Sequence, residues 1–101
     1  MPWLQAEALK VHGNVLLAAG DATAALQSLE AAISAMRRLH DPASPWLGDA
    51  LLSAALAHRS LGQRKQAKAL LTEARNIFRQ HPSLSPVFTD RLRRASQVII
   101  L

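Results

Sequence analysis

Two stretches of the chain repeat one pattern 42 positions apart. Residues 13–33 and residues 55–75 place glycine, alanine and leucine at corresponding positions. The matched pairs are Gly20 with Gly62, Ala25 with Ala67, Leu29 with Leu71, and Ala32 with Ala74. A period of this length is typical of stacked helical repeats, in which each unit buries its apolar face against its neighbours. The repeat therefore predicts a stack of helix pairs that binds another protein on its surface, and it argues against a catalytic pocket.

The composition also favours helices. Half of the 101 residues are hydrophobic, and most of these are alanine and leucine; there are only two tryptophans and two phenylalanines, and no tyrosine. Alanine and leucine are strong helix formers, whereas the β-branched residues that favour strands are scarce. A chain of this length forms one domain at most. We therefore expect a single all-α domain over residues 1–101.

The absence of cysteine excludes disulfides and thiolate metal sites. No apolar run approaches the ~20 residues that are needed to cross a bilayer. The residues that follow Met1 lack the basic start and the apolar stretch of a secretory signal. We expect a cytoplasmic protein with no cofactor and no membrane partner.

The net charge is +5, from twelve basic and seven acidic residues. Arginine carries most of the excess, in the pairs Arg37-Arg38 and Arg93-Arg94 and beside Lys65. Such a charge favours an acidic partner through long-range steering. The stretch 91–94 could contact phosphates, but no aromatic platform or helix-turn-helix signal accompanies it. Nucleic-acid binding is therefore the weaker alternative.

Turn and cap signals divide the chain into five helical segments. Gly20 can end the first helix and Asp21 can cap the second, and Gly62 marks a second tight turn. Ser44-Pro45 and Ser85-Pro86 both place proline at the first helical position after an N-cap serine. The expected helices cover residues 2–18, 22–39, 45–61, 64–80 and 86–100. The first has apolar residues at helical spacing, namely Leu4, Ala8, Val11, Val15 and Leu16.

The first, third and fifth helices begin alike, because each places proline ahead of an aromatic or large apolar residue. These matching helix starts divide the chain into two full repeats and a half repeat, at about residues 2–39, 45–80 and 86–101. Trp3 and Trp46 occupy equivalent places, and we expect both to be packing anchors.

These residues resemble the tetratricopeptide repeat, whose helix pairs combine large residues, small residues and a glycine turn. The residues that carry the resemblance are Leu9, Gly13, Leu16, Gly20, Ala25, Leu29 and Ala32 in the first repeat, Leu51, Ala55, His58, Gly62, Ala67, Leu71 and Ala74 in the second, and Leu92, Ser96 and Ile99 in the half repeat. Short side chains let the two helices of a pair approach closely. His58 departs from the pattern, which has a large apolar residue there, and the first repeat lacks the proline that often closes the second helix. The spacing of 41–42 exceeds the usual ~34 and is similar to the long-looped repeats of kinesin light chains and of bacterial multi-repeat regulatory proteins.

The resemblance implies a right-handed all-α solenoid of antiparallel helix pairs, with two full repeats plus a fifth helix. It implies a non-catalytic adaptor or scaffold that holds a partner peptide or protein in a groove lined by the first helix of each pair. The groove residues that it assigns are Lys10, Asn14, Leu17, Leu52, Ser53, Leu56, Arg59, Asp90, Arg93 and Arg94, together with Glu7, Val11, Asp49 and Gln97. The leucines would supply apolar contact, and the polar and basic side chains would orient an acidic ligand.

Some members of the family grip a peptide's terminal carboxylate with a clamp of lysine, asparagine and arginine. Lys10, Asn14 and Arg94 fall on three of the clamp positions. Ser53 stands where the clamp has asparagine, and Asp90 stands where it has lysine. Because an aspartate beside a bound carboxylate repels it, the resemblance favours solvated groove side chains over a working clamp.

Two other classes of function stay open, namely self-association and the nucleic-acid binding considered above. The four terminal apolar residues, Val98, Ile99, Ile100 and Leu101, predict self-association, because repeat stacks need polar caps and most soluble oligomers are symmetric homo-oligomers; a neighbouring segment of a longer protein is the alternative cover. An enzyme is the weakest class, because no nucleophile, base and acid show motif spacing. The histidines His12, His40, His58 and His81 form no pair at a metal-binding spacing either.

Overall fold

The structure is a computed structural model that describes residues 1–39 and 42–100. Its helices are α1 (Pro2–Ala18), α2 (Ala22–Leu39), α3 (Pro45–Ser60), α4 (Arg64–Arg79) and α5 (Pro86–Ile100). They confirm the expected all-α class, and each helix ends within one residue of its expected bound. None of them is long and apolar enough to cross a bilayer.

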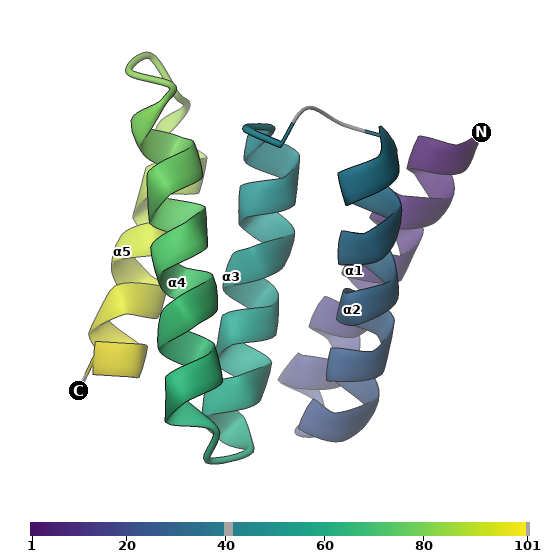
Figure 1. The fold of residues 1–101 in the computed structure, drawn as a ribbon. Coiled ribbons are helices and arrows are strands. Elements are labelled where there is room, and N and C mark those ends of the chain that lie inside the picture. Colours follow the sequence, from purple (N-terminus) through teal and green to yellow (C-terminus); the bar gives the residue numbers. More distant parts are fainter. Residues whose placement is uncertain (40–41, 101) are drawn as a thin grey trace.

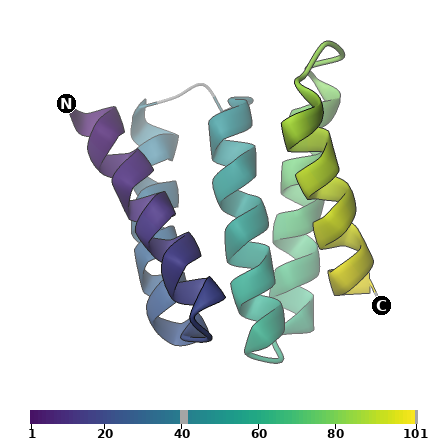
Figure 2. The same cartoon turned by 180° about the vertical axis from the view of Figure 1, so that it is seen from behind.

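The helices form two layers. α1 pairs with α2 and α3 pairs with α4 as antiparallel hairpins, and α5 packs against both α3 and α4 (Figure 1). α1, α3 and α5 lie on one side of the molecule, which faces the viewer in Figure 2, and α2 and α4 lie on the other. The shortest dimension of 20 Å matches two helices of about 10 Å each. α3 contacts α2 far more than it contacts α1, so the first hairpin joins the second mainly through α2.

Glycine makes both hairpin turns possible. Gly20 has a φ of +89° and Gly62 a φ of +75°, a backbone conformation that costs side-chain-bearing residues energy. After each glycine, the next backbone N–H bonds to a carbonyl in the last helical turn, from Asp21 to Leu16 and from Gln63 to His58, both at 2.9 Å. This arrangement satisfies carbonyl groups that would otherwise lack partners at the helix end. The sequence-based reading of Gly20 and Gly62 as turn residues is therefore confirmed.

The small residues of the repeat pack between helices as expected. The recurring alanines are all buried, namely Ala25, Ala32, Ala55, Ala67 and Ala74. At Gly13 the helices are closer still, because an added Cβ would lie 2.6 Å from Leu29 Cγ and 3.2 Å from the carbonyl oxygen of Ala25. Close packing of α1 on α2 therefore depends on a residue without a side chain.

The apolar spacing of α1 predicted the helix correctly, but these residues do not form its buried face. The buried residues of α1 are Ala6, Lys10 and Gly13. Leu4 and Val11 are about half exposed, at 49% and 51%. The helix thus buries one side against α2 and α3 and presents an apolar side to solvent.

Candidate functional site

Asp49 of α3 joins all three helices of the α1–α3–α5 layer. Its Oδ2 accepts a hydrogen bond from Lys10 Nζ of α1 at 2.8 Å, and its Oδ1 pairs with Arg91 Nη1 of α5. Lys10 Nζ also lies 2.8 Å from Glu7 Oε1, and Arg91 Nη2 donates to Ser53 Oγ at 3.3 Å. Asp49 is only 3% exposed and Lys10 only 5%. We call these five residues the Asp49 network.

The repeat explains why Asp49 pairs with basic residues of two neighbouring helices. Glu7, Asp49 and Asp90 are equivalent positions, 42 and 41 residues apart. In α1 and α5 the residue three positions later is basic and pairs locally; in α5, Arg93 Nη2 lies 3.2 Å from Asp90 Oδ1. In α3 that position is Leu52, so Asp49 has no local base. It is therefore neutralised by one cation from each side, which a buried carboxylate requires.

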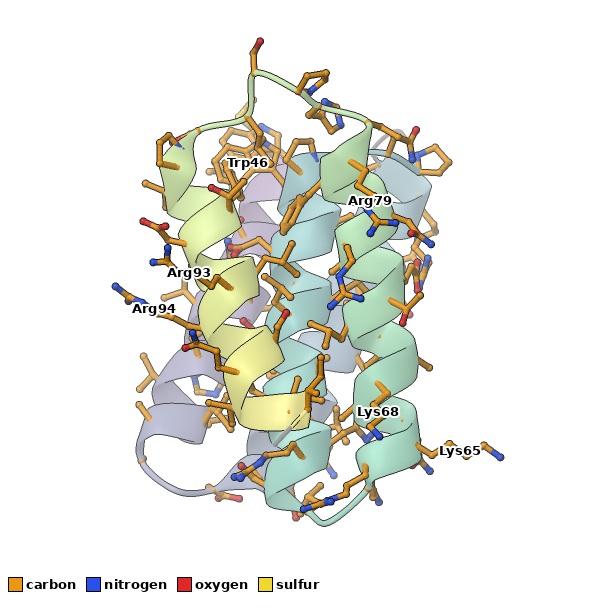
Figure 3. The ribbon with its side chains drawn as sticks, turned by 90° about the vertical axis from the view of Figure 1, so that its left-hand side faces the viewer. Trp46, Lys65, Lys68, Arg79, Arg93 and Arg94 are labelled. Carbon is orange, nitrogen blue, oxygen red and sulfur yellow. The ribbon has the colours of Figure 1, made fainter. Side chains whose placement is uncertain are left out.

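Aromatic side chains of α3, α4 and α5 form a cluster near the point where α3 and α5 begin. The Trp46 ring meets the Phe88 ring edge-on at a centroid distance of 5.5 Å, and Phe88 lies 5.9 Å from Phe78. Lys10 Nζ lies 5.6 Å from the Trp46 centroid, a cation–π contact. Gly48 leaves room for this cluster, because a Cβ there would lie 2.6 Å from Phe78 Cε1. Trp46, labelled in Figure 3, thus packs against α5 while half of its surface stays exposed.

Four of the expected groove residues are buried and cannot contact a ligand directly, namely Lys10, Leu52, Ser53 and Asp49 of the network described above. Leu52 and Ser53 are each 1% exposed, and Lys10 is engaged by Glu7 and Asp49. The expectation that these side chains face a ligand is wrong. The clamp therefore lacks its lysine, because the Lys10 ammonium is already neutralised inside the protein.

The expected self-association patch is also smaller than the sequence suggested. Ile99 is buried, at 2% exposed, because it faces the core that α3, α4 and α5 share. Val98 and Ile100 remain exposed, at 41% and 60%. Leu101 and His40 lie outside the described residues.

A shallow pocket of about 200 Å³ lies between α3 and α5. Its apolar lining comes from Leu56, Ala95 and Val98, and its charged lining from Arg91 and Arg94. The guanidinium of Arg91 is fixed in place by the Asp49 network. Arg94 makes no ion pair within the described residues and projects from the α1–α3–α5 side of α5, as Figure 3 shows. The site can therefore hold an apolar group beside a negative one.

The other expected groove residues do not line this pocket. Arg59 and Arg93 are exposed, and Asp90 is half-buried beside Arg93. Asn14 and Leu17 are half-buried on α1, on the far side of α3. The structure thus gathers Leu56 and Arg94 of the expected set. It adds Arg91, Ala95 and Val98, which the transfer of groove positions had not assigned.

A second interhelical ion pair lies in the opposite layer. Arg37 of α2 donates to both carboxylate oxygens of Glu73 of α4, at 2.8 and 3.1 Å. The hydrogen bonds that Arg37 donates to the Glu73 carboxylate raise the pKa of Arg37 above its ordinary value. Because a raised pKa keeps the guanidinium charged, the stabilisation is present at neutral pH and is lost only in strongly alkaline solution. Both side chains are well exposed, so the pair contributes little to stability.

Within residues 1–39 and 42–100, no group of three or more histidine, aspartate or glutamate side chains could hold a metal ion. His58, which departs from the repeat pattern, is half-buried, and its Nδ1 lies 2.6 Å from Gln63 Oε1. Its polar ring is thus satisfied at the hairpin turn.

Searches of the curated proteins and of the solved structures found no match to this chain. A scan against models of protein families found one that matches residues 4–80, described as tetratricopeptide repeat. Proteins with such repeats generally bind other proteins on the surface that their stacked helices form, and they are generally non-catalytic. The matched region spans both helix pairs and includes both glycine turns and the buried alanines. The chain belongs to the tetratricopeptide repeat family.

Proposed function

We propose that the chain is a non-catalytic binding module that holds an acidic segment of a partner protein in the pocket between α3 and α5. The observation that carries the proposal is Arg94, a cation with no ion pair among the described residues, beside the apolar side chains of Leu56 and Val98. A ligand with an apolar side chain next to a carboxylate would satisfy both parts of this lining. Arg91 would add a second guanidinium that Asp49 already orients.

The charge distribution supports an acidic ligand. Residues 45–101 contain nine of the twelve basic residues and three of the seven acidic ones. All three acids are paired: Asp49 with Lys10 and Arg91, Glu73 with Arg37, and Asp90 with Arg93. The basic residues around the pocket therefore attract a negative segment, and this attraction should weaken as salt is added.

A panel of labelled peptides tests the proposal by fluorescence anisotropy. Each acidic peptide in the panel contains a leucine or phenylalanine and two or three acidic residues. Each has a matched version in which the acidic residues are replaced by their amides. We expect acidic peptides to bind and amide versions not to bind. Arg94→Glu should weaken binding by about 10- to 100-fold, since a charge-assisted hydrogen bond contributes about 1.5–3 kcal/mol.

Arg79→Glu is the matched control, because Arg79 is an exposed arginine on α4, in the opposite layer (Figure 3). It lowers the net charge by the same amount but does not touch the pocket. Equal losses for the two variants would mean that net charge, not the pocket, attracts the peptide. If no acidic peptide binds the unmodified chain, the proposed function is wrong.

A further inference from the structure

The exposed side of α1 carries a continuous apolar stripe that is not covered by any of the residues that the structure describes. Its members are Met1, Leu4, Ala8, Val11, Val15 and Ala18, and every one of them is exposed. Val15 is 61% exposed and Met1 77%, which are among the largest values for the large apolar residues that the structure describes. The stripe lies opposite the buried residues Ala6, Lys10 and Gly13, so it faces away from the core. We call these six residues the α1 seam.

The spacing of the seam is that of a coiled coil. Successive members are three, four, three, four and three residues apart, which is the heptad spacing by which one helix packs along another. An apolar stripe that only serves a globular core is usually wider. α1 packs against the core of its own chain with a different set of residues, so the seam is available for a second helix.

This spacing also makes the seam complementary to itself. It reads the same in both directions, so two antiparallel copies related by a two-fold axis place Leu4 opposite Val15 of the other copy and Ala8 opposite Val11. Met1 then lies opposite Ala18. A parallel pair would instead place Ala8 opposite Ala8 and leave a void there, whereas the antiparallel pair sets small residues against larger ones.

Charge favours a second copy at this position. The residues that flank the seam are Gln5, Glu7, His12 and Asn14, and the one carboxylate among them is already paired with Lys10. Residues 1–44 contain three basic and four acidic residues, whereas residues 45–101 contain nine and three. Two copies that meet at α1 bring their nearly neutral halves together and keep their basic halves apart, so self-repulsion is smallest in this arrangement.

We propose that two copies of this chain associate through the α1 seam as an antiparallel, two-fold symmetric pair. A two-fold interface uses the same surface on both copies, which the palindromic seam provides. One short helix per copy gives an interface at the small end of the range for specific complexes. The pair is therefore expected to form at micromolar concentrations and to separate on dilution. The pocket between α3 and α5 stays open in this pair, because it lies on the other side of α3.

Sedimentation velocity across a dilution series tests the association. The unmodified chain, of 11.0 kDa, should approach twice that mass at high concentration. Val11→Glu should stay monomeric at every concentration while its helical circular dichroism is unchanged. Val87→Glu is the control, since Val87 is 64% exposed on α5 and receives the same substitution; it should dimerise like the unmodified chain. A monomer at all concentrations, or a Val11→Glu variant that dimerises normally, would overturn the proposal and leave the seam to another occupant.

Disulfide trapping tests the antiparallel orientation. Because the chain contains no cysteine, only the introduced cysteines can form disulfides. A mixture of Leu4→Cys and Val15→Cys chains should form mixed cross-linked dimers. Leu4→Cys alone should not cross-link, because the two copies of residue 4 lie about 16 Å apart along the helix axis in the antiparallel pair. Efficient cross-linking of Leu4→Cys alone would show a parallel pair and overturn the proposed geometry.

Discussion

Replacing Asp49 with asparagine removes the negative charge that three helices share. Lys10 then keeps only Glu7 as a partner while it stays buried, at 5% exposed. Arg91 is affected less, because its side chain is 36% exposed and can turn toward water. Breaking a buried ion pair from one side costs about 3–5 kcal/mol. Because Glu7 and water remain, we expect the low end, a loss of about 3 kcal/mol in the free energy of unfolding.

Urea unfolding followed by circular dichroism measures this loss directly. For a domain of this size, 3 kcal/mol should also lower Tm by roughly 12–24 °C. Glu73→Gln is the control, because it breaks the exposed Arg37–Glu73 pair and should cost less than about 1 kcal/mol. The two variants remove one carboxylate each, so the difference between them measures the effect of burial.

A double variant separates the cost of an unpaired buried charge from the contribution of the ion pair itself. Lys10→Met with Asp49→Leu replaces both buried charges with apolar side chains of similar size. Such replacements are often neutral or stabilising, so we expect a stability within about 1 kcal/mol of the unmodified chain. If Asp49→Asn costs less than about 1 kcal/mol, or if the double variant is as unstable as the single one, the reasoning about the Asp49 network is refuted.

Two glycine substitutions test the packing and the turns by the same urea assay. Gly13→Ala would place its Cβ 2.6 Å from Leu29 Cγ. It should lower the free energy of unfolding by about 1–3 kcal/mol, although alanine has the better helix propensity. A variant of unchanged stability would contradict the close approach of α1 and α2. Gly62→Ala meets no atom within 4 Å, but its φ of +75° should cost about 1–2 kcal/mol. Gly62→Asn should cost less, because asparagine tolerates this conformation better, and equal losses would contradict a backbone origin.

The fold could be predicted from the sequence because its signals are local. Gly20 and Gly62 share one repeat position, each between two segments of helical apolar spacing, and both end a helix with a positive φ. Ala25 and Ala67 stand 42 residues apart, as do Ala32 and Ala74, and all four are buried. The turn signals and the repeat period can both be read along the chain, so they need no knowledge of the distances between helices.

The candidate site was harder to predict, because its residues depend on the distances between helices. Lys10 occupies a groove position in the repeat pattern, but only the structure shows that Asp49 lies within 2.8 Å of its ammonium. A signal did exist: the acids at Glu7, Asp49 and Asp90 share one repeat position, and only Asp49 lacks a base three residues later. Likewise, the apolar spacing of α1 identified a helix, but periodicity alone cannot say which side of it meets the core.

The two tryptophans lie at equivalent places, near the starts of α1 and α3. Trp3 stands in the first turn of α1 beside Leu4, and Trp46 packs on Phe88 next to the Lys10 ammonium. Both indoles are about half exposed, so their emission should shift when a neighbouring surface is covered. A Trp3→Phe chain would leave Trp46 as the sole emitter at the α3–α5 junction, and a Trp46→Phe chain would leave Trp3 to report on α1. The protein thus carries two intrinsic optical reporters, one at the start of α1 and one at the start of α3.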